Sequence, residues 1–111
     1  DEKALKKEKP KQGAIECNSN GIVRQTVSST PNSIGYISLG YLDSSVKTLK
    51  YEGVVPSKET AVNKTYPLSR YLHMFTKGEP KELAKAYIDF VLSDRFQNEV
   101  VAKEYIPMTE I

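Results

Sequence analysis

The residues best suited to chemistry in this chain of 111 residues are Ser19, Asn20 and Gly21, which follow Asn18 at the start of an expected helix. A helix start presents free backbone N–H groups at the positive end of the helix dipole, so small polar residues there suit an oxyanion. The same residue types also suit ordinary capping, because the first N–H groups of every helix need acceptors. The pattern therefore predicts an anion-binding helix start or a plain cap, and leaves both open.

The other reactive side chains form no catalytic or metal-binding pattern. His73, the single histidine, lies between Leu72 and Met74 in an expected strand, and the sequence supplies no partner for acid–base catalysis. Cys17 is the single cysteine, which excludes an intrachain disulfide. Neither a nucleotide-binding motif nor a nucleophile elbow occurs in the sequence. We therefore expect no enzyme, no metal site and no cofactor.

Short strands and helices of an α/β domain are expected to position these residues. Apolar spacing predicts a helix from Gly21 to the Thr30–Ser33 turn, and strong helical periodicity predicts another from Lys81, with Pro80 as its first residue. Ser57 and Ser93 are expected helix caps, and the helix after Ser93 should continue until near Tyr105. Strands are predicted over residues 13–17, 34–39, 46–51 and 70–76.

Composition limits the classes of partner. The chain has 16 basic and 14 acidic residues, a balance too even to predict nucleic-acid binding, so none is expected. Lysines crowd residues 1–12, which we interpret as a flexible, solvated polar tail. No apolar run approaches the roughly 20 residues of a membrane-spanning helix.

Three stretches carry a family resemblance. They are SNGIVRQTVSSTPNSIGYISLGYLD at residues 19–43, YPLSRYLHMFTKGEP at 66–80 and KAYIDFVLSDRFQNEVVAKEYIPM at 85–108. In this order they resemble the carboxy-terminal part of the phosphate-binding proteins of ABC-type phosphate importers, a group of type II solute-binding proteins. The resemblance covers about residues 13–108.

The resemblance implies a partial type II solute-binding-protein fold: α/β, with a short mixed sheet, flanking helices and two carboxy-terminal helices. It implies that residues 13–65 are a remnant of lobe II and residues 66–111 the carboxy-terminal segment of lobe I, and that the two could pack as one compact unit. Such receptors are more than twice as long as this chain, so we expect a fragment.

The resemblance also implies inorganic phosphate as ligand, ABC permease membrane subunits as partners, and an extracytoplasmic location, periplasmic or anchored at the cell surface. The family's main phosphate ligands include an arginine followed by a Ser-Gly-Thr turn, which is absent here. Ser19, Asn20 and Gly21 are therefore expected only to support the site, and neither Arg24 nor Arg70 is assigned as a ligand. We expect the fragment to bind phosphate weakly or not at all by itself.

Two alternatives remain from the sequence. The ligand of the receptor could be another oxyanion, such as molybdate. The isolated chain could instead be an interaction or self-assembly module, because unpaired strand edges and a surface rich in its seven tyrosines would be available for association.

Overall fold

The computed structural model describes residues 8–111, and the chain divides into one unit that ends at Ser69 and a second unit, Arg70–Ile111. Residues 8–12 of the expected polar tail are exposed, whereas residues 1–7 lie outside the described part. The assignment of residues 13–65 and 66–111 to two lobes stays a prediction.

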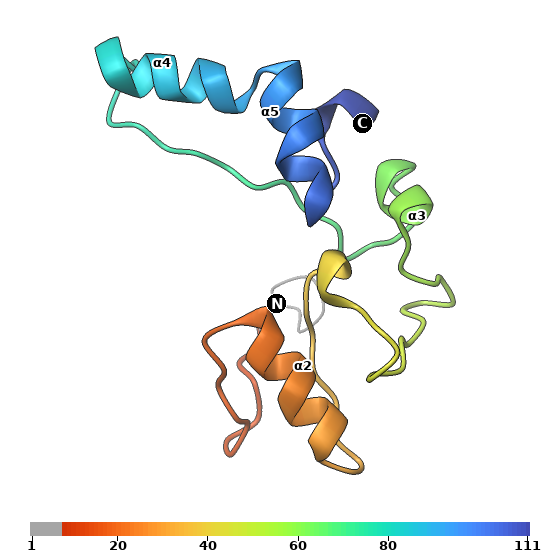
Figure 1. Cartoon of the computed structure of the whole chain (residues 1–111). Coiled ribbons are helices and arrows are strands. Elements are labelled where there is room, and N and C mark those ends of the chain that lie inside the picture. Colours follow the sequence, from red (N-terminus) through yellow and green to blue (C-terminus); the bar gives the residue numbers. More distant parts are fainter. Residues whose placement is uncertain (1–7) are drawn as a thin grey trace. The chain divides into compact units, whose positions relative to one another are not determined.

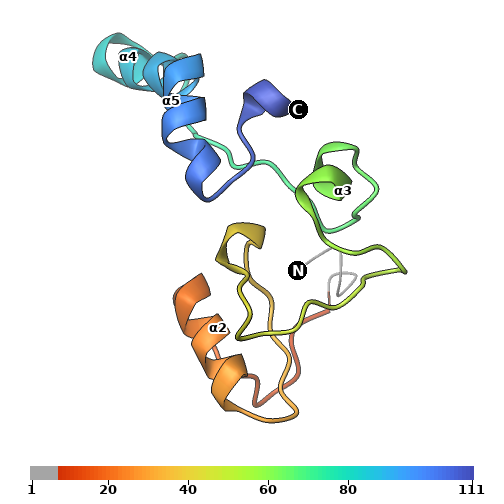
Figure 2. The same ribbon diagram turned by 45° about the vertical axis from the view of Figure 1, so that its right-hand side comes forward.

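The first unit is built around helix α2 (Asn20–Ser29), which the sequence predicts. The chain leaves α2 through a turn at Pro31 and Asn32, where Asn32 takes the left-handed conformation that asparagine tolerates, with φ 59°. Residues 33–38 then run back alongside the helix and end in the short 3₁₀ helix η1 (Leu39–Tyr41) (Figures 1 and 2). The helix and the turn are confirmed, whereas the segment that follows is extended without forming the strand that the sequence predicts.

Gly35 lets the returning segment approach α2 closely. A Cβ atom at this position would lie 2.8 Å from the Cγ1 atom of Val23 and 3.0 Å from the Cγ2 atom of Val27. Both distances are shorter than normal carbon–carbon contacts, so a side chain at residue 35 would push the segment and the helix apart. The glycine therefore sets the spacing between the two elements.

The short helix α3 (Lys58–Val62) completes the first unit and begins as the sequence predicts, with Ser57 as its N-cap. The Ser57 hydroxyl accepts the Thr60 N–H at 3.1 Å, and the Thr60 hydroxyl accepts the Ser57 N–H at 2.9 Å. This reciprocal pair satisfies two N–H groups that a helix start otherwise leaves without acceptors.

The second unit contains α4 (Glu82–Val91), α5 (Asp94–Glu99) and the 3₁₀ helices η2 (Val101–Lys103) and η3 (Met108–Glu110). Ser93 caps α5 as predicted, because its hydroxyl accepts the Phe96 N–H. The prediction that Pro80 is the first helical residue is wrong, since Lys81 is extended and α4 begins at Glu82. The helix after Ser93 also ends sooner than predicted, because Val100, with φ −117° and ψ −58°, departs from helical geometry.

The short mixed sheet expected from the sequence is not confirmed. Residues 8–111 contain no β-strand, and their isolated bridge joins Tyr51 to Val54 around a tight turn. The expected strands at 13–17, 34–39, 46–51 and 70–76 are neither helix nor strand, apart from the 3₁₀ turn that begins at Leu39 and Tyr51 of the bridge. A strand is defined by its hydrogen-bonded neighbour, and the described residues supply none for these segments.

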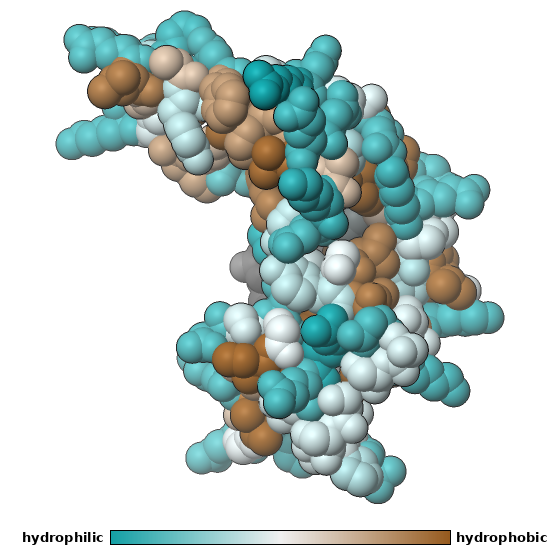
Figure 3. Space-filling view, viewed as in Figure 1, coloured by the Kyte–Doolittle hydropathy of each residue, from teal (hydrophilic) through white to brown (hydrophobic). Residues whose placement is uncertain are grey.

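Neither unit contains an apolar core within the described residues. No aliphatic or aromatic side chain there is buried, and the buried residues are Gln97 and Pro107. Phe75 and Leu83 are 90% and 85% exposed, and hydrophobic side chains reach the surface over α4 and α5 (Figure 3). A chain of this size that folded alone would bury well over half of its unfolded surface, so these apolar faces are typical of a part that packs against further protein.

Candidate functional site

The start of α2 is the candidate site, and Ser19 acts there as a helix cap. Its hydroxyl oxygen accepts the Ile22 N–H at 3.2 Å, and its carbonyl oxygen accepts the Val23 N–H at 3.1 Å. The Ser19 side chain therefore satisfies one of the N–H groups that an anion would otherwise find free.

Asn20 joins the helix start to the end of the returning segment. Its Oδ1 atom accepts the backbone N–H of Ser38 at 2.9 Å, in a partly buried environment and across 18 residues of sequence. The side chain thus fixes where residues 33–38 stop, just before η1. This hydrogen bond joins the start of α2 to the end of the returning segment.

Gly21 leaves the backbone of the first turn accessible. The residue is half-buried, and no heavy atom beyond its chain neighbours and the backbone of its own helix lies within 4 Å of the position that a Cβ atom would occupy. A small group could therefore approach the main chain here without a side chain in its way. The structure brings all three candidate residues together, two with side chains used as acceptors and one with open backbone.

Arg24 and Asp43 form a second link between α2 and the chain beyond η1. The Arg24 Nη1 atom donates to the Tyr41 carbonyl oxygen at 2.9 Å and lies 3.0 Å from the Asp43 Oδ2 atom. About a third of the arginine side chain and 45% of the aspartate side chain are exposed. Both contacts join Arg24 to residues of its own unit.

Asp43 is held in its charged form by its neighbours. The Ser45 hydroxyl and the Ser45 N–H both donate to the Asp43 Oδ1 atom. These hydrogen bonds, and then the positive charge of Arg24, hold the pKa of the Asp43 carboxyl below its usual value. Asp43 is therefore a charged anchor for α2, a role that the sequence motif ending at this residue does not predict.

Two further reactive residues are His73 in the second unit and Cys17 just before the start of α2. The His73 ring packs between the rings of Tyr71 and Phe75, with centroids 6.4 and 6.1 Å away, and Cys17 is half-buried without a disulfide. Within residues 8–111, no three histidine, cysteine or acidic side chains gather as a metal site would require. None of the helices described there has the length and apolar character needed to cross a bilayer.

Comparison with known proteins identifies the family. The profile of the PBP superfamily domain matches residues 2–95. No solved structure matches the chain. The family match covers α2, the returning segment and the helices up to the start of α5, and so includes the whole candidate site.

Known relatives carry the name phosphate-binding protein PstS. The Bacillus subtilis protein is 36% identical over 97% of this chain, the PstS 2 protein of Streptococcus agalactiae is 41% identical over 86%, and the Pseudomonas aeruginosa protein is 37% identical over 96%. This chain spans 36%, 33% and 36% of their lengths. The chain belongs to the PBP superfamily, and the relatives that it resembles over most of its length are phosphate-binding proteins.

Proposed function

We propose that this chain functions as part of a phosphate receptor of an ABC-type importer, and not as an enzyme. The observation that carries the proposal is its similarity, over nearly its full length, to proteins named for phosphate binding. The receptor would work outside the cytoplasmic membrane and pass inorganic phosphate to the permease subunits of the importer.

Ser19, Asn20 and Gly21 support the phosphate site in this proposal without supplying its main ligands. The Ser19 and Asn20 side-chain oxygens already accept backbone N–H groups, which holds both side chains in place at the helix start. The groups left to meet an anion are the Ser19 O–H, the Asn20 NH₂ group and the open backbone at Gly21, at the positive end of the helix. Because this is a small part of a phosphate-binding shell, the 111-residue chain should bind phosphate weakly or not at all.

Isothermal titration calorimetry tests which ligand the receptor binds and how weakly the 111-residue chain binds it. A receptor containing this chain should release or absorb heat when inorganic phosphate is added. Heat with molybdate and none with phosphate would show that the ligand is molybdate and not phosphate. The isolated chain should give little or no heat with phosphate. Micromolar or tighter binding by the isolated chain would overturn the supporting role of the helix start.

A second candidate function is self-assembly of the chain, favoured by its exposed apolar side chains. Phe75 and Leu83 are almost fully exposed, and Ile34 and Tyr36 are each exposed over about three quarters of their surface. Monomeric proteins rarely leave so much apolar surface uncovered. Sedimentation of the isolated chain over a range of concentrations separates the candidates, because a monomer at every concentration argues against self-assembly.

A further inference from the structure

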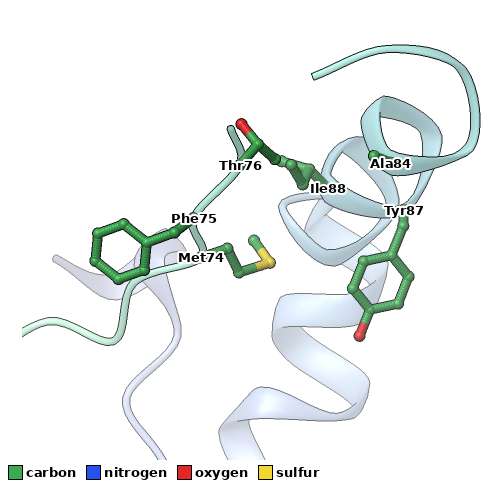
Figure 4. A pocket seen from close by; sticks show the side chains of 6 residues that line it. All are labelled: Met74, Phe75, Thr76, Ala84, Tyr87 and Ile88. Atoms are coloured by element: carbon green, nitrogen blue, oxygen red, sulfur yellow. The ribbon is translucent and has the colours of Figure 1, made fainter. Parts of the chain in front are cut away.

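Hollows in both units show where the described residues are open to solvent. The hollow of the second unit, of about 320 Å³, lies between Met74 and the α4 residues Tyr87 and Ile88, and its lining side chains are uncharged (Figure 4). In Figure 4 Met74 points toward α4, whereas the Phe75 ring points away from it. The hollow of the first unit, of about 1030 Å³, reaches the start of α2 and is lined there by residues 18–20. The helix start is therefore accessible to water.

Asn20 and Gly21 form an Asn-Gly pair, in which the main chain can attack the asparagine side chain. The Gly21 nitrogen loses its proton and bonds to the Asn20 Cγ atom, the Cγ–Nδ2 bond breaks, and Nδ2 leaves as ammonia with that proton. Water then opens the imide ring at either carbonyl group, which leaves aspartate or isoaspartate at residue 20. Glycine favours the attack because it has no Cβ atom beside the attacking nitrogen. The other asparagines all precede a residue with a side chain; they are Asn18, Asn32, Asn63 and Asn98.

The atoms that would react are unhindered at the helix start. Within residues 8–111, the Gly21 N–H donates no hydrogen bond and the Asn20 Nδ2 atom has no partner. Beyond its chain neighbours and the backbone of its own helix, no heavy atom lies within 4 Å of a Cβ position at Gly21. The first N–H groups of a helix have no acceptor inside it, so the helix does not protect the attacking nitrogen.

The hydrogen bond between Asn20 and Ser38 opposes the reaction. The Asn20 Oδ1 atom accepts the Ser38 N–H at 2.9 Å in a partly buried environment, which fixes the orientation of the carboxamide that the nitrogen must attack. Ring closure also needs rotation about the Cα–C bond of Asn20, away from its helical value. Asn20 is the first residue of α2, and helices fray at their ends, so the hydrogen bond to Ser38 is the stronger constraint.

We propose that Asn20 is a deamidation site whose rate is set by its hydrogen bond to the Ser38 N–H. The amide survives while this bond is closed, and the Gly21 nitrogen attacks when the returning segment leaves the helix start. An aspartate product adds a negative charge at the positive end of α2, whereas isoaspartate lengthens the main chain by a CH₂ group and displaces the Ser19 cap. Repulsion of phosphate by the new carboxylate rests on the proposed function, whereas the reaction itself does not.

Peptide mass spectrometry of the 111-residue chain tests the inference. Trypsin cleaves after Lys11 and Arg24 and so releases residues 12–24, which contain Asn18 and Asn20 in one peptide. During prolonged warming in mildly alkaline buffer, Asn20 should lose its amide faster than Asn18 does. Its rate in buffer should be about tenfold lower than in denaturant, because a partly buried hydrogen bond must open first.

Two substitutions of Ser38 isolate the hydrogen bond. Ser38→Pro removes the N–H, and proline suits the Ser38 φ of −66°. This variant should lose the Asn20 amide about tenfold faster than the unchanged chain in buffer, and at the same rate in denaturant. Ser38→Ala keeps the N–H and should leave both rates unchanged. Gly21→Ala places a Cβ atom beside the attacking nitrogen and should slow the reaction in denaturant.

Specific patterns of rates would overturn the inference. Equal rates at Asn20 in buffer and in denaturant, or in Ser38→Pro and the unchanged chain, would show that the hydrogen bond does not control the reaction. Equal acceleration at Asn18 and Asn20 in Ser38→Pro would trace the effect to general unfolding. Loss at Asn18 ahead of Asn20 in denaturant would show that Asn20 is not the reactive site. A receptor that contains this chain and fails to bind phosphate, with the expected rates at Asn20, would contradict the proposed function alone.

Discussion

The Oδ1 atom of Asn20 accepts the backbone N–H of Ser38 at 2.9 Å and so ties the first residue of α2 to the end of the segment that returns beside it. Asparagine at a helix start usually hydrogen-bonds within its own turn. Here Ser19 takes that role by accepting the Ile22 N–H, which leaves Asn20 free for a tertiary contact. Of the expected capping residues, Ser19 thus forms the local cap and Asn20 forms a long-range hydrogen bond.

Replacement of Asn20 should therefore loosen the returning segment more than the helix. Asn20→Ala removes the acceptor of a partly buried N–H, a loss of about 1–1.5 kcal/mol, and should accelerate amide exchange at Ser38 about tenfold. Asn18→Ala is the matched control, because Asn18 is exposed and makes no such contact. Equal exchange at Ser38 in both variants would mean that the hydrogen bond does not hold the segment.

Acid should weaken the link between Arg24 and Asp43 below the usual range of an aspartate pKa. The Asp43 pKa is lowered from 3.8, so the stability due to its charged form is fully present above that pH and is lost as the pH falls through the lowered value. NMR titration of the Asp43 carboxyl checks the cause. Ser45→Ala should raise the Asp43 pKa more than Arg24→Gln does, since the Ser45 hydrogen bonds act most strongly. Ser44→Ala should leave it unchanged.

Local signals made the helices predictable. Ser19, Ser57 and Ser93 each accept an N–H three residues ahead, so the cap and its partner lie within one turn of sequence. Pro80 misled because proline suits a first helical turn, yet the chain stays extended through Lys81 and turns at Glu82, with φ 47°. The general preference for proline in the first helical turn therefore does not predict where α4 begins.

Contacts between distant residues were not predictable in the same way. The ion pair between Arg24 and Asp43 joins residues that are distant in sequence, so no local sequence pattern predicts it. A strand needs a hydrogen-bonded neighbour, which the described residues do not supply for the predicted strands. The candidate residues Ser19, Asn20 and Gly21 do come together, because they are consecutive. Their relation to a ligand stays a prediction, since the chain spans about a third of the length of its relatives.

Alanine at two glycines should have opposite effects on the first unit. Gly35→Ala forces a Cβ atom to 2.8 Å from Val23 and 3.0 Å from Val27, and β-branched methyl groups have little freedom to move, so a loss of about 1–3 kcal/mol is expected. Gly21→Ala meets no atom within 4 Å inside a helix and should stabilise it by about 0.5 kcal/mol. Circular dichroism of the helix content on heating should rank the variants in that order, and a Gly35→Ala chain as helical as the parent would contradict the close packing.

Gln97 should be the most sensitive position of the second unit. The residue is 5% exposed, its Nε2 atom donates to the Val91 carbonyl oxygen at 2.8 Å, and its Oε1 atom accepts the Met108 N–H at 2.8 Å. Gln97→Ala leaves both backbone groups without their partners beside the buried Pro107, at a cost of about 2–3 kcal/mol, so the Met108 amide should exchange at least about 30-fold faster.

Asn98→Ala is the control for Gln97, because it removes a neighbouring amide whose contact with Thr109 is exposed. Exposed hydrogen bonds are replaced by water, so this variant should change exchange at Met108 by about twofold or less. Near-equal effects of the two substitutions would show that the carboxy-terminal turn is held by the chain around Pro107 and not by the Gln97 side chain. A larger effect of Gln97→Ala would instead establish a polar side chain as the main link in a unit whose described apolar residues are not buried.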